Sequence, residues 1–270
     1  MSRAALWIGG GLSAGVVAMA LVASVWTPYP PTRMNMRARF QPPGGEWWLG
    51  TDHFGRDIAS MILAGASTSL MVALAAVAVG MLIGVSLGCL AAVRRGWLDD
   101  LVMRCNDVVF AFPAVLSALV LAAVIGAGAH TAILAIGVFN IPVFARVARG
   151  AALQVWAREF VTAARAAGRG PLAITLVHIV PNIAGVLVVQ GTIQLALAML
   201  AEAGLSFLGV GIQPPTPSWG RMLADAQTYL ERAPHLALVP GLVIALAVLG
   251  LNLLGDGLRD VLDPKLRRAR

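Results

Sequence analysis

The sequence is dominated by long stretches that carry no charged residue. The first runs from Ala4 to Trp26 and ends at the proline-rich segment Thr27–Pro31, which cannot continue a helix. The second lies between Asp57 and Arg94. A helix needs about 20 apolar residues to cross a bilayer, and only helices or closed barrels can span one. We therefore expect a first span over Ala4–Trp26, and a second that begins near Leu70 after a segment lying at the interface.

The third uncharged stretch, Val108 to Ala145, is nearly twice as long as one crossing requires. It is predicted to fold as a helical hairpin that turns near Gly126–His130. Two further spans fit Ile183–Ala201 and Leu236–Gly255. The sequence lacks strand-length alternation of polar and apolar residues, which disfavours a barrel. It therefore predicts an all-α bundle of about six transmembrane helices.

The composition indicates a lipid environment. Apolar residues make up 59% of the 270 residues and charged residues only 12%, about half the share usual in soluble domains. The basic residues lie between apolar stretches rather than on one stripe, which argues against nucleic-acid binding. Cys89 and Cys105 are predicted to be packing residues. No metal site is expected from the histidines, which lie in separate places without ligand spacing: His53, His130, His178 and His235.

The arginines predict the orientation, since cytoplasmic loops hold an excess of Arg and Lys. With the N-terminus inside, most basic residues fall in the segment 94–104, the loop 146–180 and the C-terminal tail. Both termini are thus predicted to be cytoplasmic. The alternative is that Arg3, the following apolar stretch and Ala18–Ala20 form a cleaved signal peptide, leaving five spans. A retained helix is favoured because the apolar run continues past that cleavage site at spanning length.

The loop from Arg146 to Val180 is too polar to enter lipid and rich in alanines that favour helix. Its polar side chains fall at helical spacing on one stripe, whereas Phe160, Ala164 and Ala167 line another face. The residues of the polar stripe are Arg158, Thr162, Arg165 and Arg169.

This helix is expected to break at Gly168–Gly170, after which Pro171 is well placed to begin a second short helix. The second helix is expected to end near Val180, where Pro181 begins the return into the membrane. The predicted product is a stiff, bent helical element at the cytoplasmic surface.

The order of Thr162–Ala164, Gly168 and Pro181 resembles the EAA loop of ABC importer permeases. The resemblance implies a coupling helix that docks into a groove of an ATPase subunit. Thr162 stands where the family commonly has Glu, and Val180 where it has Leu, so the resemblance implies docking but gives no support for a specific salt bridge to the ATPase. Glu159, one turn earlier, is expected to supply the local negative charge. The implied coupling residues are Glu159, Thr162, Ala163, Ala164, Arg165, Gly168 and Pro181.

Two further stretches are similar to the peptide/nickel permease family in particular: Leu49–Ile58, and Glu202–Gly211 followed by Pro214–Gly220. The similarity extends from about Trp48 to Pro264. It implies a bacterial-type inner-membrane importer in which this chain pairs with a second, homologous permease. The implied partners are two ATP-binding subunits and an extracytoplasmic solute-binding protein.

The implied division of the chain has three parts. Residues 1–60 hold the first transmembrane helix and an outer segment, 61–264 form the importer transmembrane domain with five spans and the coupling loop 146–181, and 265–270 form a basic cytoplasmic tail.

Uncharged polar groups inside the spans are candidates to line the pathway, because exposing an amide to lipid is costly. Hydrogen bonding between helices would explain them equally well. These residues are Asn140, Gln190, Gln194 and Asn252. The glycines Gly80, Gly84 and Gly88 are predicted to allow close helix contact. The polar segment Gly50–Asp57 is interpreted as a structural turn in which Arg56 pairs with an aspartate.

The outer loop 210–234 is compatible with two roles. It could receive a solute-binding protein, or it could simply cap the bundle.

The sequence contains no motif for nucleotide hydrolysis. Its one lysine, Lys265, is followed by Leu266, and no phosphate-binding loop of the Walker type is found. We therefore expect a noncatalytic subunit without a cofactor of its own, with ATP and Mg²⁺ bound by partner subunits. The resemblance implies di- or oligopeptides as substrates, with nickel or metal chelates as the alternative. An ion-coupled secondary transporter is disfavoured by spans almost free of charge, and a membrane enzyme by the absence of a catalytic cluster.

Overall fold

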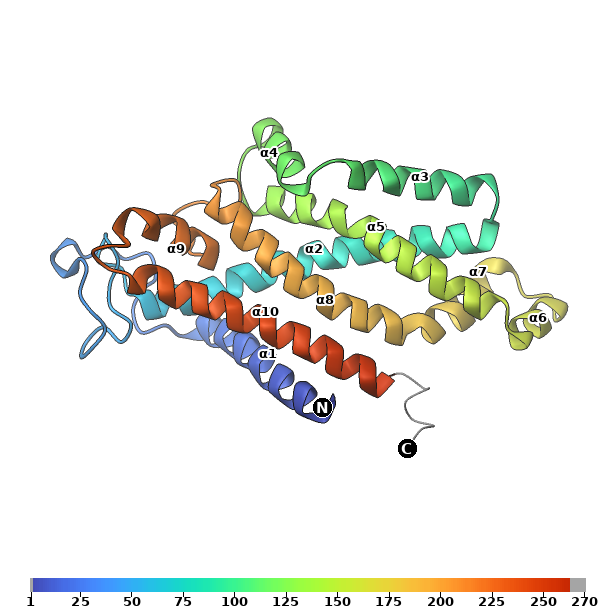
Figure 1. Cartoon of the computed structure of the whole chain (residues 1–270), viewed down its shortest axis with the longest axis horizontal. Helices are drawn as coiled ribbons and strands as arrows, with labels where there is room; N and C mark the ends of the chain where they lie inside the picture. Colours follow the sequence, from blue (N-terminus) through green and yellow to red (C-terminus); the bar gives the residue numbers. More distant parts are fainter. Residues whose placement is uncertain (1, 263–270) are drawn as a thin grey trace.

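The computed structural model describes residues 2–262, and the predicted basic tail 265–270 lies outside this range. Most helices run along the long axis of a single bundle (Figure 1). Short 3₁₀ turns occur at Met36–Ala38 and Gln227–Tyr229, and a π-helical turn at Thr175–Ile179. The α-helices are α1 Ser2–Val25, α2 Ile58–Arg94, α3 Trp97–Ala111, α4 Ala114–Ile125, α5 Ala129–Trp156, α6 Glu159–Ala166, α7 Pro171–Ile174, α8 Val180–Phe207, α9 Trp219–Ala226 and α10 His235–Leu262.

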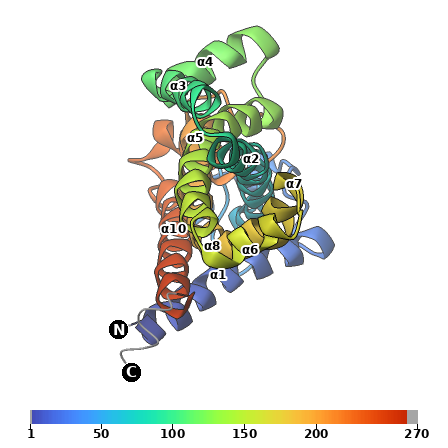
Figure 2. The ribbon, with the colours of Figure 1, turned by 90° about the vertical axis from the view of Figure 1, so that its right-hand side faces the viewer.

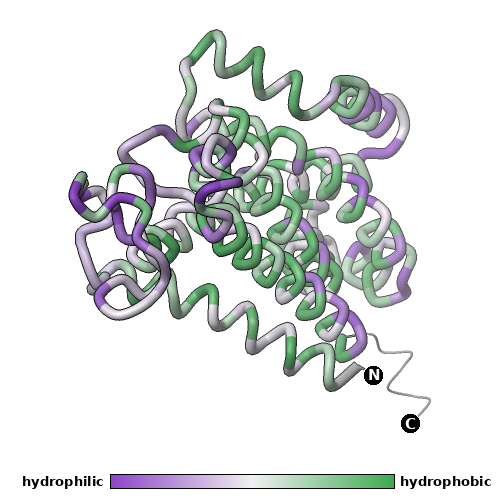
Figure 3. Tube along the Cα trace, turned by 60° about the vertical axis from the view of Figure 1, so that its left-hand side comes forward, coloured by the Kyte–Doolittle hydropathy of each residue, from purple (hydrophilic) through white to green (hydrophobic). Residues whose placement is uncertain are grey.

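The long helices match the predicted membrane spans. Five helical segments of the described chain are long and apolar enough to cross a membrane, and a sixth span results if α3 and α4 are counted as one broken span. Apolar residues line the bundle, whereas polar residues gather in the loops at its ends (Figure 3). The prediction of an all-α membrane bundle of about six spans is confirmed.

The second predicted span begins earlier than expected. α2 is one continuous helix from Ile58 to Arg94, not a span from about Leu70 preceded by an interfacial segment. Asp57 caps its first turn, because the carboxylate accepts hydrogen bonds from the Ser60 amide at 2.8 Å and the Ser60 hydroxyl at 2.6 Å. Buried apolar residues then pack the first turns of α2 into the bundle. These turns are therefore stable as a direct continuation of the spanning helix.

Close contact between α2 and α5 organises the centre of the bundle. A Cβ atom added at Gly84 would lie 2.5 Å from the carbonyl oxygen of Ile141, and one added at Gly88 would lie 2.3 Å from that of Ala145. Gly80 meets Asn140 in the same way. The glycines at four-residue intervals therefore let the two backbones touch, as predicted, and the helices gain dispersion contacts that lipid would not replace.

The first helix packs along the last one. Gly9 of α1 lies against the backbone of Leu254, and Gly250 of α10 lies against Leu12. The start of α1 and the end of α10 point toward the same end of the bundle as α6 and α7 (Figure 1).

The loop 210–234 folds back into the bundle. It contains α9, whose Trp219 is 1% exposed and donates its indole N–H to the carbonyl of Ile62 at 3.0 Å. Gly65 on α2 leaves room for this ring. Much of this loop is therefore a packed cap over the bundle.

Candidate functional site

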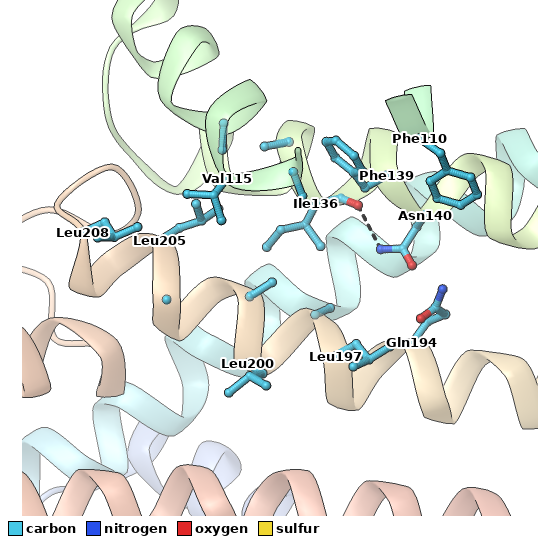
Figure 4. Close-up of a pocket in the computed structure, with 16 residues that line it drawn as sticks. Phe110, Val115, Ile136, Phe139, Asn140, Gln194, Leu197, Leu200, Leu205 and Leu208 are labelled. Carbon is cyan, nitrogen blue, oxygen red and sulfur yellow. Dashed lines mark hydrogen bonds between the residues drawn. The ribbon is translucent and has the colours of Figure 1, made fainter. Parts of the chain in front are cut away.

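A cavity of about 450 Å³ opens between α3, α4, α5 and α8. Its wall is largely apolar, and two amide side chains, Asn140 of α5 and Gln194 of α8, reach it from facing helices (Figure 4). Both residues are buried, at 6% exposure. The apolar lining includes Phe110, Val115, Ile136, Phe139, Leu197 and Leu205.

The helix that borders this cavity is broken. α3 and α4 meet at an angle of 85° across Phe112 and Pro113. Proline restricts the residue before it to extended conformations, and Phe112 has φ −95° and ψ 134°. The first half of the predicted hairpin over Val108–Ala145 is therefore bent instead of being one helix, although the turn at Gly126–Gly128 lies where expected. Broken helices within membranes occur where the backbone is covered by protein or lines water.

The four predicted pathway residues do not come together. Asn140 and Gln194 line the same cavity, whereas Gln190 and Asn252 do not contribute to its wall. The amide groups of Asn140 and Asn252 donate to carbonyls of their own helices, Ile136 at 2.9 Å and Val248 at 3.0 Å. The side-chain amides of Asn140 and Asn252 therefore form hydrogen bonds within their own helices, not between helices.

The predicted coupling residues Glu159–Arg165 lie on α6 and Gly168 in the turn that follows it, at the opposite end of the bundle from α9 (Figure 1), whereas Pro181 lies in α8. Figure 2 views the bundle from this end, with α6 and α7 toward the viewer. Glu159, Thr162, Ala163 and Arg165 are exposed, and Ala164 is half-buried. The inward anchor of α6 is Val161, which is fully buried.

Two further contacts hold this element against the bundle. The Arg165 guanidinium lies over the ring of Trp156 with 4.6 Å to its centroid, and Ile174 of α7 is 1% exposed. Phe160 is 40% exposed and contacts His178 edge-on. The face of α6 that packs on the bundle therefore consists of Val161 and Ala164. The predicted apolar face of Phe160, Ala164 and Ala167 matches it only at Ala164.

The bend between α6 and α7 follows the sequence. Gly168 adopts φ +80°, a conformation that side chains disfavour, and its amide donates to the Arg165 carbonyl at 2.9 Å. Pro171 occupies the first turn of α7, where its missing N–H costs nothing. The predicted break and restart are confirmed.

Pro181 lies in the first turn of α8, which begins at Val180 as the predicted return into the membrane does, but the preceding short helix leads into α8 without a break. The chain remains helical from Pro171 to Phe207. Proline lacks the amide hydrogen that an α-helix uses, and the π-helical turn at Thr175–Ile179 changes the register just before it. The Val180 amide therefore bonds to Thr175, five residues back.

The polar segment Gly50–Asp57 is a structural turn, as interpreted. Arg56 donates to the Asp52 carboxylate at 2.6 Å and lies 3.4 Å from Asp225 near the end of α9. His53 stacks on Tyr229 with a centroid distance of 5.0 Å. Burial lowers the pKa of His53 below its ordinary value of 6.5, against the opposing influence of the Asp52 and Asp225 carboxylates.

Glu202 is a buried acidic residue whose contacts the sequence analysis did not predict. It lies inside α8, is fully buried, and accepts a hydrogen bond from the Ser206 hydroxyl at 2.7 Å. The Ser206 oxygen also accepts the Ile212 amide at 2.9 Å, so this pair fastens the loop that follows α8. The signal was available as a lone acidic residue in an apolar span, four residues before a serine.

Comparison with known proteins identifies the group to which this architecture belongs. Residues 80–268 match the family described as the binding-protein-dependent transport system inner membrane component. A di/tripeptide transport system permease protein, DppC of Pseudomonas aeruginosa, is 41% identical over 94% of this chain and 86% of its own length. A glutathione transport system permease protein, GsiD of Pectobacterium atrosepticum, is 42% identical over 93% of this chain and 84% of its own length.

Among solved structures, the inward-facing MetNI methionine ABC transporter has a chain of similar fold. The TM-score is 0.62 at 21% sequence identity, covering 74% of this chain and 95% of the other. Family, relatives and fold therefore agree, and the chain belongs to the family of inner membrane components of binding-protein-dependent transport systems, as a multi-pass permease subunit of an ABC importer that works with an ATPase and a solute-binding protein.

Proposed function

We propose that this chain forms half of a translocation pathway for di- and oligopeptides and is driven through its loop 158–181. The proposed substrate class is supported by relatives at 40–42% identity whose names specify di/tripeptide, glutathione and dipeptide transport. The chain covers most of the length of each relative, so the comparison concerns a whole subunit.

The observation that carries the mechanism is the exposed, bent element α6–α7. It is anchored to the bundle by Val161 and Ile174 on one side and presents small side chains such as Ala163 on the other. Small residues allow the backbone of another protein to approach closely. The same element continues as a helix into α8, which carries Gln194 at the cavity. A movement imposed on α7 is therefore delivered directly to the wall of the cavity.

In this mechanism the chain itself is noncatalytic and holds no cofactor. Two ATP-binding partner subunits bind ATP and Mg²⁺, and a second, homologous permease completes the pathway. Asn140 and Gln194 provide hydrogen-bonding groups for a peptide backbone in an otherwise apolar wall. Both termini and α6–α7 face the cytoplasm, while the segment 27–57 and α9 face outward.

The test is a matched pair of substitutions in the complete transporter reconstituted into liposomes with its binding protein. Gly168→Val forces a branched side chain into φ +80°, and we expect peptide uptake per ATP hydrolysed to fall about tenfold or more while the purified complex retains its subunits. Gly170→Ala is the control, since Gly170 has φ −71° and open space around it. Uptake per ATP that is equal in the two variants would remove this coupling role.

A further inference from the structure

An ion pair lies beside the cavity at the side nearer α6. The Arg146 guanidinium donates to the Asp107 carboxylate at 2.5 Å, and both side chains are about half exposed, at 44% and 52%. The same guanidinium lies over the ring of Phe110 with 4.7 Å to its centroid. Phe110 is part of the cavity wall (Figure 4), so the ion pair lies next to the cavity, behind this ring.

Arg146 directly follows the uncharged stretch of α5, which ends at Ala145. A charged side chain at the end of an apolar stretch reaches water or another protein chain rather than lipid. Arg146 is two helical turns from Phe139, which also lines the cavity, so both belong to the same face of α5.

A second ion pair between the same helices shows the contrast. Arg149 binds Asp99 through two hydrogen bonds of 2.5 Å, and this pair is more buried, with exposures of 33% and 11%. It already fastens α3 to α5. Half-exposed pairs contribute little to stability, so the Asp107–Arg146 pair is not needed as a fastener.

We propose that Asp107 and Arg146 receive the opposite charges of a zwitterionic solute as it passes from the cavity toward α6. The guanidinium binds the solute carboxylate and the Asp107 carboxylate binds the solute ammonium, so each charge exchanges one partner for another. The rest of the cavity wall offers amides and apolar groups only. This inference rests on the proposed function and assigns the recognition of charge to two residues.

The experiment compares uptake of two dipeptides, alanyl-glutamate and alanyl-lysine, by the complete transporter in liposomes. Asp107→Asn leaves a free cation at the site, and we expect the ratio of acidic to basic peptide uptake to rise about fivefold. Arg146→Gln leaves a free anion and is expected to lower the ratio by about the same factor. The binding protein is the same in every assay, so its own preference cancels.

The matched controls are Asp99→Asn and Arg149→Gln, which break the other ion pair between the same helices and are expected to leave the ratio unchanged. The double variant Asp107→Asn with Arg146→Gln removes both charges and is expected to restore the wild-type ratio. Equal losses for both peptides, or ratio shifts in one direction for both single variants, would overturn the inference alone. Wild-type liposomes that take up neither peptide would instead refute the proposed peptide function on which it rests.

Discussion

Single glycines set the distance between α2 and α5, which makes them sensitive to the smallest added side chain. Gly84→Ala places a methyl group 2.5 Å from the Ile141 carbonyl oxygen, and we expect a destabilisation of about 1–3 kcal/mol because the helices must separate. Thermal unfolding of the purified complex in detergent measures this loss.

The control for this prediction is Gly150→Ala on α5. No atom lies within 4 Å of a Cβ at Gly150, and alanine favours helix, so this variant should be as stable as the wild type or more stable by about 0.5–1 kcal/mol. Identical unfolding temperatures for the Gly84 and Gly150 variants would contradict the packing argument.

His53 makes the contact between the segment 35–57 and the 225–235 region dependent on pH. Because burial lowers the pKa of His53 in the folded protein, the folded state binds fewer protons than the unfolded state. The stabilising contribution is therefore complete above about pH 6.5 and is lost as the pH falls below it. We expect hydrogen exchange in residues 35–57 to accelerate between pH 7.5 and 5.5, after correction for intrinsic rates.

His53→Phe tests this assignment, because it keeps an aromatic ring against Tyr229 but cannot bind a proton. The acid sensitivity should disappear in this variant. Acceleration of the same size in both proteins would assign the effect to other groups near His53, of which the charged ones are Asp52, Asp225, Arg56 and Arg39.

At the scale of elements, α6 depends on its neighbour α7. Ile174 is 1% exposed and belongs to the cluster that includes Val161 and Trp156. Ile174→Ala removes this support at a cost of about 2–5 kcal/mol, so we expect faster amide exchange across residues 159–166. Leu172→Ala on the same short helix is the control, since Leu172 is 72% exposed. Similar exchange in the two variants would show that α6 is held by other contacts.

The sequence predicts an element well when the residues that determine it are adjacent in the chain. Hydropathy locates the spans, and Gly168 with Pro171 locates the bend, because both signals lie in adjacent residues. The unbroken helix through Pro181 depends on a π-helical turn, and the early start of α2 depends on burial under Trp219. These causes lie in register changes and distant contacts that a linear pattern does not contain.

The candidate site was predicted less completely than the fold. Asn140 and Gln194 face one cavity whereas Gln190, one turn from Gln194, does not line it. Which polar residue of a helix meets a neighbour depends on how the helices are rotated about their axes. Phe112–Pro113 was an available signal for the break in α3–α4, since the residue before a proline disfavours helix.

At the scale of the whole molecule, the start of α1 and the end of α10 point toward the end of the bundle that carries α6–α7, opposite α9 (Figure 1). We expect a membrane-impermeant maleimide to label Arg37→Cys in intact spheroplasts and Arg169→Cys only after permeabilisation. Both positions are exposed. The background for both is Cys105→Ser, because Cys105 is exposed while Cys89 is buried. The reverse labelling pattern would invert the proposed orientation.

The helical continuity of α7 and α8 determines when the two ends of this segment move relative to each other. A rigid rod transmits rotation to all of its points at once, and the segment Pro171–Phe207 stays helical throughout. In the proposed mechanism, rotation that enters at Pro171 must reach Gln194 at the cavity and Glu202, about two turns further along α8, together. Access from the two sides of the membrane would then change in one concerted step.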